Sequence, residues 1–173
     1  MPQANRLNLP SAPIKQQIAN KAEWNQLRSS KDADFFTFGY SGRKTDEILN
    51  ALSRHGVRTV IDVRRNPVSM YRPELSKTNF ARLLDLHGIG YSHLPEFGVP
   101  REVRARAIET GSREVIWAWY DSNVIAYFIN HNSFLRGFEH PVALMCTEID
   151  PRECHRHRLA LALEGMGLEG FEL

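Results

Sequence analysis

Short apolar runs alternate with amphipathic segments along the chain, and this pattern predicts strands that alternate with helices. Residues 35–38 form a short aromatic run and residues 57–63 and 142–146 form apolar runs of the kind found in buried strands. Residues 89–94 are expected to form a further strand. A fifth short strand is expected within 167–173. Because such alternation favours right-handed crossovers, the sequence predicts an α/β fold, a three-layer sandwich with a mostly parallel, five-stranded sheet.

Apolar positions three or four residues apart predict the helices that connect these strands. One helix begins near Thr45, a second follows Ser76, and residues 100–138 are helical and rich in aromatic side chains. The second helix places His87 on its apolar face, where we expect a partly buried core histidine. The last helix has Asp150 as its N-cap residue and a proline at its first position.

A length of 173 residues suits one domain with an ordinary hydrophobic core. We expect residues 1–34 to form an N-terminal extension with one short helix around 14–27, and residues 35–173 to form a single α/β domain. No run of 18 apolar residues is present, and residues 1–34 lack the apolar segment of a secretory signal. We therefore expect a cytoplasmic location without membrane association.

The basic residues of the chain indicate an anionic ligand. A formal net charge of +2 is too small to predict nucleic-acid binding by itself. However, 17 of the 22 basic residues are Arg, whose planar guanidinium suits phosphate and carboxylate groups. In a reducing compartment the two cysteines, Cys146 and Cys154, are expected to be free, catalytic or metal-bound rather than joined in a structural disulfide.

Polar side chains follow three of the predicted strands at their carboxyl ends. In open parallel sheets, ligands bind beyond these ends, where the strand order reverses. With a strand order of 3-2-1-4-5, the three sets would share one rim of the sheet. They are Gly39, Tyr40 and Ser41 after the first strand, Asp62, Arg64 and Arg65 after the second, and Cys146, Thr147 and Glu148 after the fourth.

Arginines on this rim are candidates for binding the anion. Arg64 and Arg65 directly follow a buried run and could hold a phosphate or carboxylate bidentately. Arg156, near the N-terminus of the last helix, is a further candidate. The alternative is that one arginine forms a structural salt bridge to Asp62 or Glu148 while another is exposed.

Cys146 and Glu148 alternate along a strand, so near its end they point to the same side of the sheet. Cys154 and His155 lie in the first turn of the following helix, whose dipole favours a thiolate, and His155 can donate a hydrogen bond to a loop carbonyl. Three interpretations stay open: a cysteine is a nucleophile while Glu148 moves a proton, the four side chains bind a metal, or Cys146 is a small buried hydrophobic residue. The spacing Cys-x7-Cys-His matches no familiar zinc motif, so we assign no metal ligand.

Aromatic side chains near the predicted rim also have two interpretations. Tyr71 and Tyr91 either line the pocket or cover the core. The helix around Trp117 and Trp119 either stacks a nucleobase or packs within the fold or against another subunit.

Four blocks of the sequence together point to a known family. They are Thr37-x-Gly39-Tyr40-Ser41, Ile61-Asp62-Val63-Arg64 followed by Pro67 and Ser69, Gly88-Ile89-x-Tyr91, and Met145-Cys146-x-Glu148 with Cys154-His155-Arg156. With these blocks the chain, from about Phe36 to the C-terminus, resembles the uncharacterised domain of unknown function 488 family. The resemblance implies a compact α/β domain of bacteria and archaea without a settled activity. Tyr40 stands where the family usually has His, and Gly98-Val99 replaces a Gly-Gly pair, so we expect a rim of different shape.

These features predict an enzyme that acts on a phosphorylated or nucleotide-like anionic substrate at the carboxyl ends of the strands. Cys146 would be the nucleophile and Glu148 would move a proton. The residues assigned to the anion site are Gly39, Tyr40, Ser41, Asp62, Arg64, Arg65, Cys154, His155 and Arg156. One alternative is a noncatalytic module that binds a nucleotide or nucleic acid. Another is a thiol-based sulfurtransferase, which the absence of a six-residue loop around either cysteine disfavours. The sequence identifies no cofactor, and a second copy of the chain is a further candidate partner.

Overall fold

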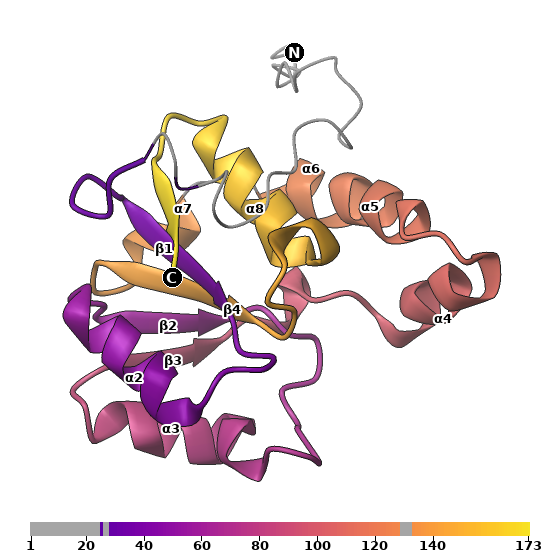
Figure 1. Cartoon of the computed structure of the whole chain (residues 1–173). Helices are drawn as coiled ribbons and strands as arrows, with labels where there is room; N and C mark the ends of the chain where they lie inside the picture. The colour runs from indigo at the N-terminus through magenta and orange to yellow at the C-terminus, as the bar shows by residue number, and fades with distance from the viewer. Residues whose placement is uncertain (1–24, 26–27, 129–132) are drawn as a thin grey trace.

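The computed structural model describes Asn25 and residues 28–128 and 133–173, and its centre is a sheet of five parallel strands (Figure 1). The strands are β1 (Phe35–Gly39), β2 (Thr59–Asp62), β3 (Gly90–His93), β4 (Val142–Cys146) and β5 (Gly170–Glu172). All five overlap the predicted strand segments, and every neighbouring pair is parallel. The predicted α/β fold with a parallel, five-stranded sheet is therefore confirmed.

The strand order is β3-β2-β4-β1-β5, which differs from the order 3-2-1-4-5 considered from the sequence. β4 lies at the centre, where its Val142 pairs in register with Phe35 of β1 and with Thr59 of β2. β1 and β4 are both buried along their whole length, so hydrophobicity does not distinguish the central strand from its neighbour. As a result, Cys146 at the end of β4 stands between the residues that follow β1 and those that follow β2.

Helices cover both faces of the sheet (Figure 1). They are α2 (Thr45–Arg54), α3 (Lys77–Asp85), α4 (Arg101–Thr110), α5 (Glu114–Tyr120), α6 (Ala126–Phe128), α7 (Ser133–Arg136) and α8 (His155–Glu164). Because alternate strand residues point to opposite faces, Phe36 and Phe38 belong to the apolar cluster with α2 and α3. Phe35 belongs to the other cluster, with Leu159 of α8 and Tyr120 of α5.

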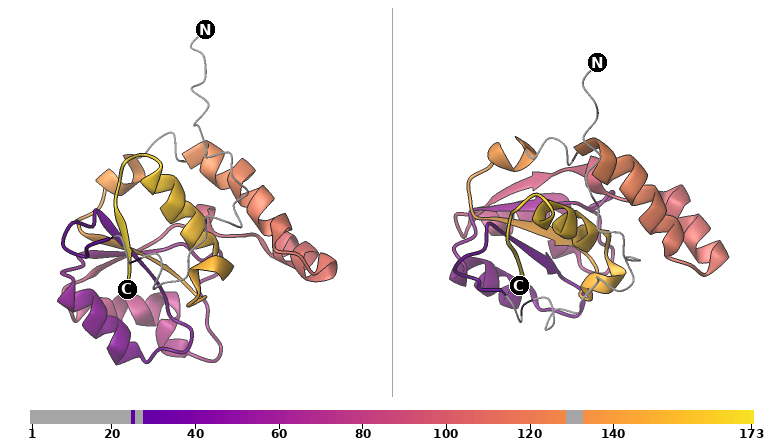
Figure 2. Two further views of the ribbon diagram at one scale, coloured as in Figure 1. Left: turned by 45° about the horizontal axis from the view of Figure 1, so that its top comes forward. Right: turned by 90° about the horizontal axis from the view of Figure 1, so that it is seen from above.

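The segment between 100 and 138 is helical in its described part, as predicted. After α5 it continues through a π-helical turn, Asp121–Ile125, and α4 and α5 together extend beyond the edge of the sheet (Figure 2). Tyr120 anchors this extension, because its fully buried hydroxyl donates a hydrogen bond of 2.8 Å to the Phe97 carbonyl. Burial raises the pKa of Tyr120 well above its usual value, so the hydroxyl stays a donor.

Two local predictions differ from the structure. Asp150 caps a 3₁₀ turn, Pro151–Glu153, by accepting the backbone N–H of Arg152 at 2.9 Å, and α8 begins only at His155. His87, predicted to be partly buried, is exposed. The reason is that α3 ends at Asp85, so His87 lies in the following turn rather than on the apolar face of the helix.

The helix predicted around 14–27 lies outside the described residues, apart from Asn25. The Asn25 side chain donates a hydrogen bond to the Glu172 carbonyl at 2.9 Å and accepts one from the Glu172 backbone N–H at 3.1 Å. It thus provides hydrogen-bond partners for backbone groups at the edge of β5. Among the described residues, no helix combines the length and the apolar composition that crossing a bilayer requires.

Candidate functional site

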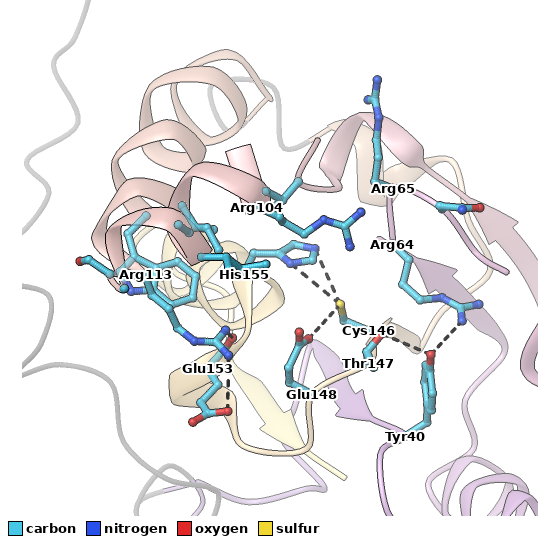
Figure 3. A pocket seen from close by; sticks show the side chains of 18 of the residues that line it. Tyr40, Arg64, Arg65, Arg104, Arg113, Cys146, Thr147, Glu148, Glu153 and His155 are labelled. Atoms are coloured by element: carbon cyan, nitrogen blue, oxygen red, sulfur yellow. Dashed lines mark hydrogen bonds and ion pairs between the residues drawn. The ribbon is translucent and has the colours of Figure 1, made fainter. Parts of the chain in front are cut away.

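A pocket of about 530 Å³ opens where the carboxyl ends of the strands meet α4 and α5 (Figure 3). Its polar walls come from the residues after β1, β2 and β4 and from the start of α8, and its apolar wall comes from α4 and α5. The polar lining residues include Tyr40, Arg64, Arg65, Arg104, Arg113, Cys146, Thr147, Glu148, Glu153 and His155. The position matches the general rule for ligand sites in open parallel sheets.

Cys146 lies at the floor of this pocket beside two groups that can move protons. Its Sγ is 3.6 Å from Oε2 of Glu148 and 3.8–3.9 Å from the two ring nitrogens of His155. Nε2 of His155 lies 3.1 Å from the Val63 carbonyl, and a carbonyl can only accept a proton. In the neutral ring, Nε2 therefore carries the hydrogen and Nδ1 is the acceptor, while the thiol lies at almost the same distance from both ring nitrogens. The expected hydrogen bond from His155 to a loop carbonyl is confirmed.

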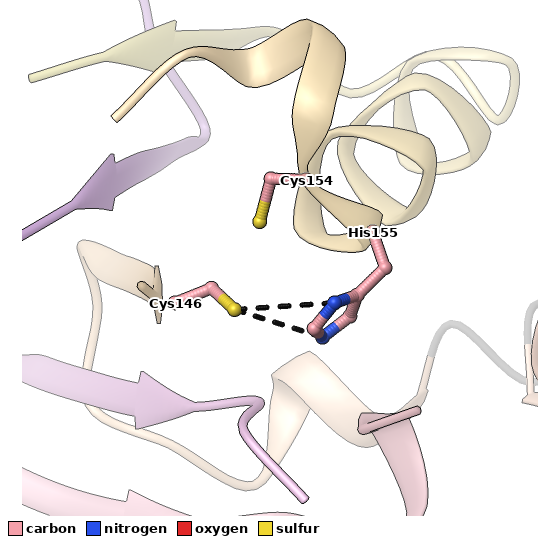
Figure 4. Close-up of side chains that lie close together, drawn as sticks. All are labelled: Cys146, Cys154 and His155. Atoms are coloured by element: carbon pink, nitrogen blue, oxygen red, sulfur yellow. Dashed lines mark hydrogen bonds between the residues drawn. The ribbon is translucent and has the colours of Figure 1, made fainter. Parts of the chain in front are cut away.

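Cys154 lies behind Cys146 and does not line the pocket. It is 1% exposed, and burial together with the neighbouring Cys146 raises the pKa of its thiol well above the usual value. The two sulfurs and one ring nitrogen of His155 all lie within 4.8 Å of one another (Figure 4). Among the described residues these three side chains form the cluster that could hold a metal ion.

Arg64 lines the pocket but is held by other groups of the chain. It is 5% exposed and donates hydrogen bonds to both carboxylate oxygens of Asp62, to the Tyr40 hydroxyl and to the Leu75 carbonyl. Burial alone would lower the pKa of this guanidinium, but the fully buried Asp62 raises it above its usual value. The structural salt bridge considered for this arginine is thus present, and few of its N–H donors are left for a ligand.

Three other arginines present less constrained guanidiniums to the pocket. Arg104 of α4 is exposed, its side chain makes no hydrogen bond or ion pair with the residues that the structure describes, and its guanidinium extends over the pocket (Figure 3). Arg113 donates to the Glu153 carbonyl at 2.6 Å in an exposed setting. Arg65 is exposed and donates to the Pro95 carbonyl at 3.2 Å, and its side chain points away from Cys146. Of these three guanidiniums, that of Arg104 is the least held by other groups of the described residues.

Arg156, predicted to bind the anion, does not lie at the pocket. It is fully buried and donates to the Thr37 hydroxyl, to the Glu148 carbonyl at 2.6 Å and to the Glu172 carboxylate. These partners belong to β1, to the loop after β4 and to β5. Arg156 therefore connects three segments inside the fold and supports the backbone beneath the pocket.

Three more residues assigned from the sequence lie outside the pocket lining. Asp62 is buried beneath Arg64, and Ser41 uses its backbone N–H on the Thr147 carbonyl at 2.9 Å. Gly39 lies at the end of β1, where the Glu148 carbonyl approaches so closely that a Cβ would be 1.8 Å from it. The glycine is thus needed to let the loop that carries Glu148 approach β1.

The aromatic candidates contribute little accessible surface to the pocket. Trp117 lines the pocket but is 8% exposed and packs against the Arg158 guanidinium, 5.6 Å from the ring centre, so its faces are poorly placed to stack a base. Tyr71 is 99% exposed, and the Tyr91 hydroxyl donates to Oδ2 of Asp62; neither residue lines the pocket.

Tyr91→Phe should lower the free energy of unfolding by about 1.5 kcal/mol or more, the contribution of a hydrogen bond to a buried charge. The Tyr91 hydroxyl donates to Oδ2 of Asp62 at 2.6 Å, and burial, followed by the charge of Asp62, raises the pKa of this tyrosine. Urea denaturation measures the change. Tyr71→Phe is the matched control and should leave stability unaltered, and an equal effect of both substitutions would contradict the assignment.

Arg104 and Arg113 are not among the site residues predicted from the sequence, because residues 100–138 show mainly the pattern of an aromatic helical segment. A weak signal existed: Arg104 lies three and four residues before Ala107 and Ile108, which places a guanidinium beside an apolar face. The sequence does not show that this apolar face of α4 lines the pocket.

Comparison with known proteins supports the resemblance seen in the sequence. A model of the family described as "Domain of unknown function DUF488" matches residues 44–163, which is more than half of the chain. This match contains Cys146, Glu148, Cys154 and His155. No curated protein and no solved structure gives a significant match. The chain therefore belongs to the DUF488 family.

Proposed function

We propose that this protein is an enzyme that uses Cys146 as a nucleophile on a small phosphorylated or nucleotide-like substrate. The proposal rests on one observation above all: the Cys146 thiol faces a pocket between the Glu148 carboxylate and the His155 ring, while Arg104 extends over the same pocket. A nucleophile with an adjacent base that is itself oriented by a third group is the usual arrangement in covalent catalysis. Here the third group is the Val63 carbonyl.

The proposed reaction begins when Nδ1 of His155 takes the thiol proton of Cys146. The sulfur then forms a bond to the electrophilic atom of the substrate, and the bond from that atom to the leaving group breaks. The leaving group departs with the electron pair and takes a proton from the carboxyl group of Glu148, which carries this proton at the start of the reaction. In hydrolysis, a water molecule attacks the intermediate and returns a proton to Glu148, while the sulfur leaves as thiolate and recovers its proton from His155.

The anionic part of the substrate would bind the arginines at the pocket mouth. Arg104 supports this role best, because its guanidinium makes no other polar contact within the described ranges and can bind a phosphate bidentately. Arg113 is held by a hydrogen bond of 2.6 Å to the Glu153 carbonyl and by an ion pair to the Glu153 carboxylate, in which both side chains are about half exposed, and such exposed contacts contribute little stability. It can therefore change partner when an anion enters.

A panel of phosphomonoesters and nucleotides, assayed for release of product, tests the proposal. Cys146→Ser and Glu148→Gln should each reduce turnover to background. Arg104→Gln should raise KM about 10-fold or more, because it removes a charge-assisted contact. Arg106→Gln, on the same helix but away from the pocket, is the matched control and should leave KM unchanged.

Several results would contradict this function. Turnover retained in both Cys146→Ser and Glu148→Gln would remove their assigned roles. Oligonucleotide binding that weakens steeply with salt, without turnover of any substrate, would favour a nucleic-acid binding module. A persulfide on Cys146 after incubation with a sulfur donor, detected by mass spectrometry, would favour sulfur transfer.

A further inference from the structure

Cys146, Cys154 and His155 lie close enough together at the pocket floor to bind a metal ion, and the proposed thiol reaction does not use this arrangement. We propose that Cys146, Cys154 and His155 form a binding site for one thiophilic divalent cation of the zinc class, and that an ion bound there blocks the Cys146 nucleophile. The metal site is inferred from the positions of its three side chains alone, whereas the blocking effect rests on the proposed function.

The distances between the donor atoms are close to those of a zinc site. With Zn–S of about 2.3 Å and Zn–N of about 2.0 Å in a tetrahedral site, neighbouring donors lie roughly 3.5 Å apart. In this protein Sγ of Cys146 is 3.9 Å from Nδ1 of His155, and the three donor atoms all lie within 4.8 Å of one another. Small side-chain rotations are enough to bring them onto one ion.

The orientation of His155 also suits a metal ligand. Metal-binding histidines almost always donate the second ring N–H to a carbonyl or carboxylate, which fixes the tautomer and the ring plane. The Val63 carbonyl accepts from Nε2 of His155 and leaves Nδ1, 3.9 Å from Sγ of Cys146, as the ring nitrogen that can bind an ion. The outer contact that a zinc ligand needs is thus already made by the fold.

The fourth coordination position faces the pocket. Cys146, His155 and Glu148 line the pocket, whereas Cys154 closes the site from behind. Oε2 of Glu148, 3.6 Å from Sγ of Cys146, can reach the open position, or a water can occupy it. Two thiolates and an imidazole select zinc-like ions over magnesium or calcium, which prefer oxygen ligands.

The unusual spacing of the ligands has a structural explanation. In small zinc motifs the paired cysteines belong to one tight turn, which sets the familiar short spacing. Here Cys146 ends β4 and Cys154 is the N-cap residue of α8, and the 3₁₀ turn Pro151–Glu153 folds the chain back so that the two sulfurs approach. The spacing argument against a metal therefore does not apply to this arrangement.

A metal ion bound at this site prevents Cys146 from acting as a nucleophile. The electron pair of the Cys146 sulfur that would attack a substrate is the pair that binds the metal. Removal of zinc should therefore expose a reactive thiol, and its addition should hide it.

Cobalt and zinc titrations of the chelator-treated full-length protein test the site. One equivalent of Co²⁺ should bind with a thiolate-to-cobalt charge-transfer band, and one equivalent of Zn²⁺ should displace it. Cys154→Ala should weaken Zn²⁺ binding by at least about 100-fold, more than the loss of an outer partner typically does. If Cys154→Ala does not fold, as judged by circular dichroism, His155→Asn replaces it, because that side chain is only half-buried. Absence of stoichiometric binding, or undiminished binding in the folded variant, would overturn the site.

Alkylation of Cys146 by iodoacetamide tests the blocking effect without any substrate. Zinc should protect Cys146 in the natural protein, with protection reversed by a chelator, and should not protect it in Cys154→Ala. Because neither readout needs turnover, failure to find a substrate bears on the proposed function alone. Rapid alkylation of the zinc-loaded protein would overturn the blocking effect, and turnover that rises with zinc would do so as well, leaving the metal site in place.

Discussion

Replacing Arg156 with methionine should lower the free energy of unfolding by about 3–5 kcal/mol, as the loss of one partner from a buried ion pair does. Methionine fills much of the same volume but donates no hydrogen bond. The substitution would remove the guanidinium from the Glu172 carboxylate, which is 2% exposed, and would leave the Thr37 hydroxyl and the Glu148 carbonyl without this donor. Urea denaturation followed by circular dichroism measures the loss.

Arg152→Met provides the matched control, because Arg152 lies in the same region but forms an exposed ion pair with Asp150. Its effect should stay below about 1 kcal/mol. The double variant Arg156→Met, Glu172→Leu should recover part of the loss, since it removes both charges from the interior. Equal destabilisation by Arg152→Met and Arg156→Met would show that burial of the Arg156 charge does not matter.

Arg156 also shows which part of the site could not be predicted from the sequence. Its position near a helix start, beside two cysteines, is what an anion-binding arginine would show. Its partners Thr37 and Glu172 are 119 and 16 residues away along the chain. No local pattern says that these groups meet, so the sequence cannot separate a buried structural arginine from a ligand-binding one.

Arg64 is the opposite case, because its partner is local. Asp62 lies two residues before it, and the Asp-x-Arg spacing made a salt bridge one of the two interpretations. The spacing does not show how many N–H donors of the Arg64 guanidinium remain free to bind a ligand. That depends on the Tyr40 hydroxyl and the Leu75 carbonyl, which come from distant segments and take two further N–H donors.

The convergence of Cys146, Glu148 and His155 was predictable because each of its causes is local. Cys146 and Glu148 are two residues apart at a strand end, so they share a side, and the N-cap signal after them places His155 close to the same strand end. The central place of β4 was not predictable, since β1 and β4 have the same apolar pattern. Strand order depends on which edges pair across long crossovers, and the long helical segment between β3 and β4 carries no visible signal of that choice.

Gly39 connects the fold to the site through backbone contacts alone. A Cβ at this position would lie 1.8 Å from the carbonyl oxygen of Glu148, 2.4 Å from its carbonyl carbon and 2.8 Å from Cα of Ile149. All three atoms belong to the main chain, so no side-chain rotation can relieve the overlap. Either β1 or the loop that carries Glu148 must move, and Gly39 pairs in register with Cys146.

Gly39→Ala should therefore lower the free energy of unfolding by about 3 kcal/mol or more, at the upper end of the cost of overpacking. It should also slow alkylation or turnover at Cys146 under conditions where the variant is still folded, because the displaced loop carries Glu148. Gly90→Ala is the matched control: it too lies in a strand, but its nearest neighbour would be 3.5 Å away, so its effect should stay within about 0.5 kcal/mol. If Gly39→Ala kept the natural free energy of unfolding and the natural reactivity of Cys146, a Cβ at this position would not overlap the Glu148 carbonyl. That result would contradict the close approach of β1 and the loop that carries Glu148.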